Sequence, residues 1–150
     1  MTRYIVTVLV AGLLLAAEGK KGDAKKDQEA LQGTWRPVSS EQGGKDQTDE
    51  AKEYTLTFDK DTFTVKKGNE VMFKGTFKLD PSKRPKAIDM TVTEGRRDDD
   101  KGKEVLGIYE VDKDSLKWCT AEPGGKDRPK AFATKEGTKD LLVTLKKEKK

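Results

Sequence analysis

The sequence predicts an all-β protein: a single antiparallel up-and-down barrel of about eight strands, preceded by an export signal and a short helical turn. Three observations favour this fold. Apolar and polar residues alternate with period two after residue 33, short turn sequences separate the alternating segments, and the derived hairpin registers share one apolar face. Sequential pairing favours an up-and-down barrel over a Greek key, with a two-sheet sandwich as the alternative.

Residues 1–19 have the pattern of a signal peptide. Arg3 supplies a positive charge, and the apolar run over 5–17 is shorter than the roughly 20 residues of a membrane span. Ala17-Glu18-Gly19 offers a cleavage site, with a cut after Ala16 or Ala17, or an uncleaved anchor, as alternatives. We therefore expect an extracytoplasmic protein, periplasmic or secreted, with no stable membrane span after cleavage, in which residues 20–27 are a polar tether and 28–150 the barrel domain.

The barrel domain is expected to begin with a short helical turn. Asp27 is a suitable N-cap for a turn over residues 28–32, and Gly33 is a suitable residue to end it. The first strand is then predicted over residues 31–38, with the side chain of Trp35 inside the barrel.

Two hairpins have nearly the same turn chemistry, with Lys60-Asp61 at one turn and Lys113-Asp114 at the other. Cross-strand partners share a face of the sheet, so each turn fixes which side chains meet. The apolar pairs expected inside are Leu56–Val65, Phe58–Phe63, Val111–Leu116 and Tyr109–Trp118. The pairs expected outside are Thr57–Thr64 and Glu110–Lys117. Both registers therefore bury one face and leave the other to solvent.

The hairpin between these two is predicted to turn over three residues, 67–69, which include Gly68 and Asn69. This register pairs Val65 with Val71, Phe63 with Phe73, and Lys66 with Glu70. Further strands are predicted over residues 71–79, 87–93, 130–134 and 141–146. Gly75 within a predicted strand indicates a bulge or a sharp bend.

The composition excludes several classes of function. The chain has no histidine, which excludes Ser-His-Asp and Cys-His catalysis and His-ligated metals, and its single cysteine cannot build a thiolate zinc site. No glycine-rich phosphate loop is present, and the run over residues 98–100 lacks the ligand spacing of a calcium loop. The net charge of +4 is dispersed rather than gathered in a basic stripe, which argues against nucleic-acid binding. We expect no enzymatic activity and no cofactor.

The remaining hypotheses concern binding. An eight-stranded barrel is wide enough to be filled by side chains or to hold one small ligand. The residues expected to line it, and to contact a small apolar or amphipathic molecule, are Trp35, Leu56, Phe58, Phe63, Phe73, Phe77, Met90, Tyr109 and Trp118. If these side chains only fill the core, the alternative is a cell-envelope structural or interaction module that uses the charged loops at 96–103 and 122–130. Cys119 is expected to be a buried, inert thiol; the alternative is a reactive thiol beside Lys117.

A Gly-x-Trp at residues 33–35, opening the first strand, resembles the lipocalin signature, in which the Trp closes one end of the barrel. The wider set of motifs resembles an uncharacterised lipocalin-like domain family abundant in planctomycete bacteria. These motifs are Leu31-Gln-Gly-Thr-Trp35, Gly75-Thr-Phe-Lys-Leu-Asp-Pro81, Pro85-Lys-Ala-Ile-Asp89, Gly107-Ile-Tyr-Glu110, Asp114-Ser-Leu-Lys-Trp-Cys119 and Arg128-Pro-Lys-Ala-Phe132. The resemblance implies a lipocalin-like barrel outside the cytoplasm and implies no activity. In lipocalins a basic residue from late in the chain lies over the Trp, and here that residue would be Arg128 or Lys146.

Overall fold

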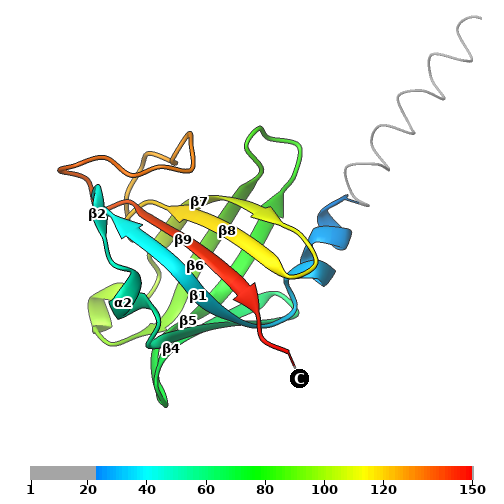
Figure 1. Ribbon diagram of the computed structural model, residues 1–150, viewed down its shortest axis with the longest axis horizontal. Helices are drawn as coiled ribbons and strands as arrows, with labels where there is room; N and C mark the ends of the chain where they lie inside the picture. Colours follow the sequence, from blue (N-terminus) through cyan, green and yellow to red (C-terminus); the bar gives the residue numbers. More distant parts are fainter. Residues whose placement is uncertain (1–22, 150) are drawn as a thin grey trace, which may run out of the picture.

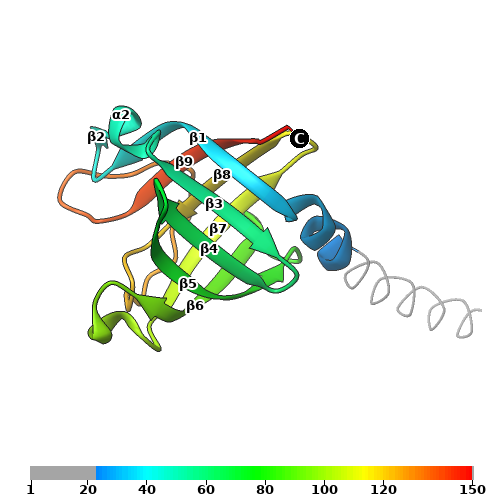
Figure 2. The same ribbon diagram turned by 90° about the horizontal axis from the view of Figure 1, so that it is seen from below.

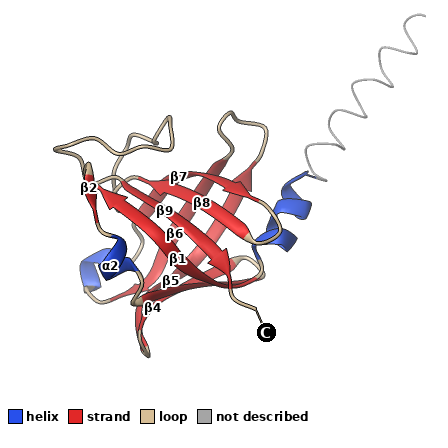
Figure 3. Ribbon diagram, in the orientation of Figure 1, coloured by secondary structure: helices blue, strands red, loops and turns tan. Residues whose placement is uncertain are grey.

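A computed structural model of the chain describes residues 23–149, which form a closed antiparallel β-barrel (Figures 1 and 3). Eight strands make the wall: β1 (Gly33–Gln42), β3 (Tyr54–Asp59), β4 (Thr62–Lys67), β5 (Glu70–Asp80), β6 (Ala87–Gly95), β7 (Glu104–Val111), β8 (Ser115–Thr120) and β9 (Leu141–Lys147). They pair in this order, and β1 pairs with β9 to close the barrel. The predicted all-β up-and-down barrel is confirmed.

Short helices and a short strand lie at the two ends of the barrel. At one end a helix over residues 23–31 lies where β1 begins (Figure 2). At the other end β2 (Lys45–Asp46) pairs with the end of β1, followed by α2 (Thr48–Ala51), and the 3-10 turn η1 (Asp98–Asp100) lies between β6 and β7. We call these the helix end and the far end. Among the described residues, no helix combines the length and the hydropathy that crossing a membrane requires.

The segment before β1 differs from the prediction. Residues 23–27 are helical rather than a polar tether, and Leu31 ends this helix rather than starting a strand. Asp27 is not an N-cap but a buried residue within the helix, only 8% exposed. The helix is held by tertiary contacts of Asp27 and Leu31, which local sequence does not reveal. The predicted signal peptide (1–19) and residues 20–22 lie outside the described residues.

The two hairpins with similar turn chemistry are confirmed pair by pair. Phe58 lies opposite Phe63, and Tyr109 opposite Trp118, with the remaining partners in the expected register. Lys60 adopts a φ of 56°, a conformation that a tight two-residue β-hairpin turn demands. The apolar face predicted from these registers is the inner face of the barrel.

The register of the β4–β5 hairpin was wrongly predicted. The turn uses two residues, Gly68 and Asn69, so that Lys67 lies opposite Glu70, and a bulge between Val65 and Lys66 then shifts the pairing. Val65 consequently faces Phe73, while Phe63 faces Gly75. The predicted irregularity at Gly75 is confirmed, since the β5–β6 register shifts between residues 74 and 75.

The β8–β9 connection, residues 121–140, contains no strand, so the strand predicted over residues 130–134 is absent. This connection is the long orange loop in Figure 1. It is fastened at the far end, where Asp140 O accepts a hydrogen bond from Gly43 N at 3.2 Å and Thr134 Oγ1 accepts one from Gly44 N at 2.8 Å. These contacts, rather than pairing with a neighbouring strand, hold the connection at the far end.

Candidate ligand site

All nine residues predicted to line the barrel face its interior, but they divide into two groups. Seven are fully buried: Trp35, Leu56, Phe58, Phe63, Phe77, Met90 and Tyr109. The rings of Phe58 and Phe77 meet edge to face, with centroids 5.1 Å apart. Phe73 and Trp118 are only partly buried. The seven buried residues therefore form packed core, and the accessible inner surface involves the other two.

The helix end is closed around Trp35, which is 0% exposed. Its Nε1 donates a hydrogen bond to Leu31 O at 2.7 Å, which ties the first strand to the helix. The Lys147 ammonium lies 5.2 Å from the centre of the Trp35 ring and donates to Ala30 O at 3.0 Å. A cation over the face of an indole ring is attracted to it, and this attraction further stabilises the closed helix end.

The residue over Trp35 is therefore Lys147, and the prediction of Arg128 or Lys146 was wrong. Successive strand residues point to opposite faces. Lys147 lies opposite Trp35 in the β1–β9 pairing, whereas Lys146 lies opposite Arg36 and is exposed. Arg128 lies in the β8–β9 connection and binds elsewhere. A one-residue error in sequence position thus moves a side chain from the interior to the solvent.

A second set of contacts holds the helix to the barrel. The Asp27 carboxylate accepts hydrogen bonds from the Tyr109 hydroxyl at 2.8 Å and from Lys86 Nζ at 2.9 Å. Burial raises the pKa of Tyr109 well above its usual range, and the neighbouring Asp27 carboxylate raises it further. This group was not found from the sequence, since Asp27 and Tyr109 lie 82 residues apart.

The Tyr109 hydroxyl predicts a loss of stability at high pH. In the unfolded chain a tyrosine ionises near pH 10, whereas the folded protein keeps Tyr109 protonated, so its contribution is present below pH 10 and is lost above it. Between pH 9 and pH 11 we expect the wild type to lose about 1.4 kcal/mol more unfolding free energy than Tyr109→Phe. Urea titrations at each pH measure this difference. Parallel pH curves for the two proteins would contradict it.

Inward-facing apolar side chains stay partly accessible, mostly toward the far end. Seven of them pack against the core without being fully buried. Leu79 and Val111 lie at the helix end, and the other five form the far-end cluster: Val65, Phe73, Val105, Trp118 and Leu141. They come from five different strands of the wall and leave apolar surface in contact with solvent. The sequence predicts two of the five, Phe73 and Trp118, as ligand contacts, and it also places Val65 inside the barrel. The alternation that places Tyr109 and Val111 inside also predicts that Val105 faces inward.

Trp118 carries the polar group of the far-end cluster. Its ring lies 6.5 Å from that of Phe58, and it pairs across the sheet with Tyr109 and Val143. Its Nε1 is buried, and among the described residues it is the only buried side-chain nitrogen or oxygen without a hydrogen-bond partner. A buried donor left unpaired costs about 1–3 kcal/mol. The interior therefore offers one unused N–H beside accessible apolar surface.

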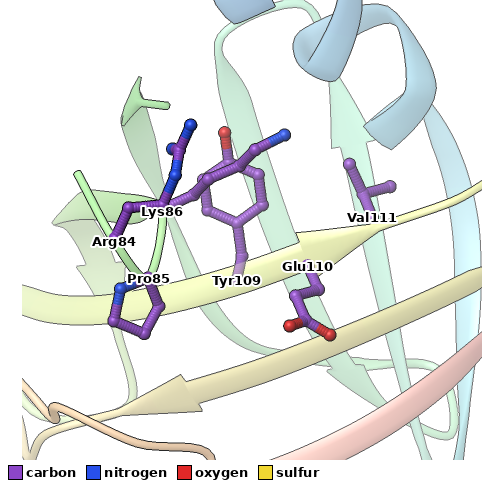
Figure 4. Close-up of a pocket in the computed structure, with 6 residues that line it drawn as sticks. All are labelled: Arg84, Pro85, Lys86, Tyr109, Glu110 and Val111. Atoms are coloured by element: carbon purple, nitrogen blue, oxygen red, sulfur yellow. The ribbon is translucent and has the colours of Figure 1, made fainter. Parts of the chain in front are cut away.

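A separate pocket of about 240 Å³ lies near the helix end, between the β5–β6 loop and the end of β7 (Figure 4). It is lined by Arg84, Pro85, Lys86, Tyr109, Glu110 and Val111. In Figure 4 the Lys86 side chain crosses the Tyr109 ring, and Glu110 points away from both. Two of its polar groups are already engaged by Asp27, and its volume is below the roughly 300 Å³ of small ligand sites. It is the weaker candidate.

Cys119 lies on the outer face of β8 beneath the 121–140 connection and is 0% exposed. Its Sγ is 3.7 Å from Ala133 O, and burial raises the pKa of the thiol. A thiol with a raised pKa forms little thiolate at neutral pH. The prediction of a buried thiol is confirmed, and the raised pKa argues against the reactive alternative.

Arg128 clamps the same connection to the barrel wall. Its Nη1 donates to Ile88 O at 3.1 Å and to Gly107 O at 2.8 Å, and its Nη2 bonds the Asp89 carboxylate. The guanidinium thus joins β6 and β7 to a segment that has no strand partner. The shielding of Cys119 depends on this segment staying in place.

We predict that Arg128→Met exposes Cys119. Loss of the three hydrogen bonds increases local opening of the connection, and we expect thiol modification by a disulfide reagent to accelerate about tenfold. Arg84→Met is the matched control, because Arg84 also precedes a Pro-Lys-Ala sequence but bonds the carbonyls of Pro81 and Lys83. Equal modification rates in both variants would show that Arg128 does not hold the connection closed.

Comparisons with protein-family models, with curated proteins and with solved structures found no match for this chain.

Proposed function

We propose that this protein is an exported, non-enzymatic carrier that binds one small apolar or amphipathic molecule in the far half of its barrel. The observation that carries the proposal is the far-end cluster, five inward-facing apolar side chains that remain partly accessible. A ligand that covers this inward-facing apolar surface removes it from water, which favours binding. A single unpaired donor, Trp118 Nε1, lies at the same place.

The division of the interior supports a small ligand rather than a large one. The helix half is occupied by the seven fully buried side chains and is closed by the helix that contacts Trp35 and Tyr109. Barrels of eight strands have room either for packing or for one small ligand. Here packing takes one half, so the ligand has the other half and enters from the far end.

The test is a titration of the purified protein with N-phenyl-1-naphthylamine, an uncharged probe whose emission rises in apolar surroundings. We expect saturable binding at one site per chain, weakened several-fold by Phe73→Ala, which removes inner apolar surface. Val71→Ala is the matched control on the same strand. Val71 is 41% exposed, so its truncation leaves binding unchanged.

The second candidate is an envelope interaction module with a filled core. The edge-to-face packing of Phe58 on Phe77 favours it for the helix half. Its contact surface would be the charged loops at 96–103 and 122–130, which lie at the far end and beside it. Failure of the probe to bind, or equal effects of Phe73→Ala and Val71→Ala, would reject the carrier and leave this module.

A further inference from the structure

We infer that the ligand of the barrel is an uncharged amphiphile whose hydrogen-bond acceptor pairs with Trp118 Nε1, which makes Trp118 the specificity-determining residue. This inference rests on the proposed carrier function and adds the chemical class of the ligand. It starts from two facts about one side chain. The Trp118 ring is only partly buried among inner apolar residues, yet its N–H is fully buried and unpaired.

The contrast with the other tryptophan shows what the unpaired group means. Trp35 Nε1 is equally enclosed, but it donates to Leu31 O at 2.7 Å. The fold therefore satisfies one indole with its own backbone and leaves the other without a protein acceptor. Buried polar groups are nearly always paired, so an exception calls for an explanation, and a bound ligand is the one that fits the accessible apolar surface beside it. A ligand acceptor that displaces the side chains covering Nε1 would supply that partner, next to the accessible part of the Trp118 ring.

The charge of the ligand follows from what faces the interior. On the inward-facing positions of the eight wall strands, the charged residues are Lys67 and its cross-strand partner Glu70, both at the far end, and Lys147, at the helix end. Lys67 Nζ lies 3.5 Å from the Glu53 carboxylate, and Lys147 contacts Trp35 and Ala30. Neither cation is free beside Trp118.

An anionic headgroup at Trp118 would thus lose its hydration without gaining a counter-ion. Such burial is strongly unfavourable, whereas a neutral carbonyl or ether oxygen is satisfied by one donor. The acceptor is therefore a ketone, ester or ether rather than a carboxylate. The apolar part of the molecule would contact the rest of the far-end cluster, including Phe73 and Leu141.

The experiment compares matched ligands of one chain length: 2-undecanone, undecane and undecanoate, each displacing the naphthylamine probe. In the wild type we expect the ketone to bind about tenfold more tightly than the alkane, as one net hydrogen bond provides, and the carboxylate to gain no such advantage. In Trp118→Phe the ketone-to-alkane ratio should fall about tenfold or more, because the ketone oxygen is then buried without a donor. Phe73→Leu, a change in apolar contact alone, should keep the ratio while it weakens both ligands.

A direct readout does not depend on affinity. In ¹⁵N-labelled protein the indole resonance that Trp118→Phe removes should shift when the ketone is added and shift less with the alkane, while the other described indole, Trp35, stays in place. If the probe does not bind at all, the carrier function fails. If the probe binds but the ketone-to-alkane ratio is the same in Trp118→Phe, or undecanoate binds as tightly as the ketone, the carrier stands and the inference about Trp118 is wrong.

Discussion

Trp35→Ala is expected to remove about 3–5 kcal/mol of unfolding free energy, most of what holds a small domain together. Trp35 is among the largest fully buried side chains, and its loss leaves a cavity at the closed end of the barrel. It also leaves Leu31 O without its donor and Lys147 without the aromatic ring beneath it. Urea unfolding followed by far-ultraviolet circular dichroism measures the change, because most of that signal comes from the barrel strands.

Trp35→Phe separates the loss of ring volume from the loss of the hydrogen bond, and Val38→Ala is the control. Trp35→Phe keeps much of the ring volume and removes the hydrogen bond, so we expect a smaller loss of about 1–2 kcal/mol. Val38→Ala on the same strand is the control, because Val38 is 39% exposed and its truncation should change stability by less than about 0.5 kcal/mol. If Trp35→Ala and Val38→Ala unfold at the same urea concentration, Trp35 does not contribute to the stability of the closed helix end.

The parts of the fold that sequence predicts are those encoded within a few residues. The turns at Lys60 and Lys113 each fix a register, because the residues that flank each turn most closely alternate between apolar and polar. The sequence of the β4–β5 turn does not fix its register. Residues 67–69 permit a loop of two or three residues, and the choice between them depends on a bulge that restores the inner position of Phe73. That choice follows from packing across the barrel.

The helix and the 121–140 connection depend on partners far along the chain. Asp27 is a plausible N-cap by local rules, but its contacts with Lys86 and Tyr109 place it in the middle of a helix. The predicted strand at 130–134 has suitable residues, yet Arg128 binds β6 and β7 carbonyl groups and keeps that segment outside the sheet. Local propensity is outweighed in both places by a group of polar contacts with residues far along the chain.

For the candidate site, the sequence identified which side chains face inward but not which of them a ligand can reach. Alternation assigns Phe63 and Phe73 to the same face, and both lie inside. Only Phe73 stays partly accessible, because the helix closes one end of the barrel and packing fills that half. The unpaired N–H of Trp118 likewise depends on where every neighbouring acceptor lies, which no local pattern encodes.

Gly75→Ala is expected to destabilise the protein by about 3 kcal/mol, although it adds a single methyl group. A Cβ at this position would lie 2.0 Å from Thr91 O and 2.7 Å from the Phe63 ring. The carbonyl belongs to the paired strand β6, so relief requires the β5–β6 pairing to open. The ring is buried in the core and opposite Gly75 in the register, so it cannot retreat without displacing its own neighbours.

The same substitution at Gly68 separates steric overlap from backbone strain. Gly68 has a φ of +61°, and nothing lies within 4 Å of the place that an added methyl group would take, so Gly68→Ala should cost only about 1 kcal/mol. The rates of amide hydrogen exchange show which strands the substitution destabilises. In Gly75→Ala we expect faster exchange in β5 and β6 than in the β7–β8 hairpin, because the overlap acts on the pairing of those two strands. Equal stability of the two alanine variants would mean that Phe63 repacks freely, and the helix half of the barrel would then be loosely filled instead of solid.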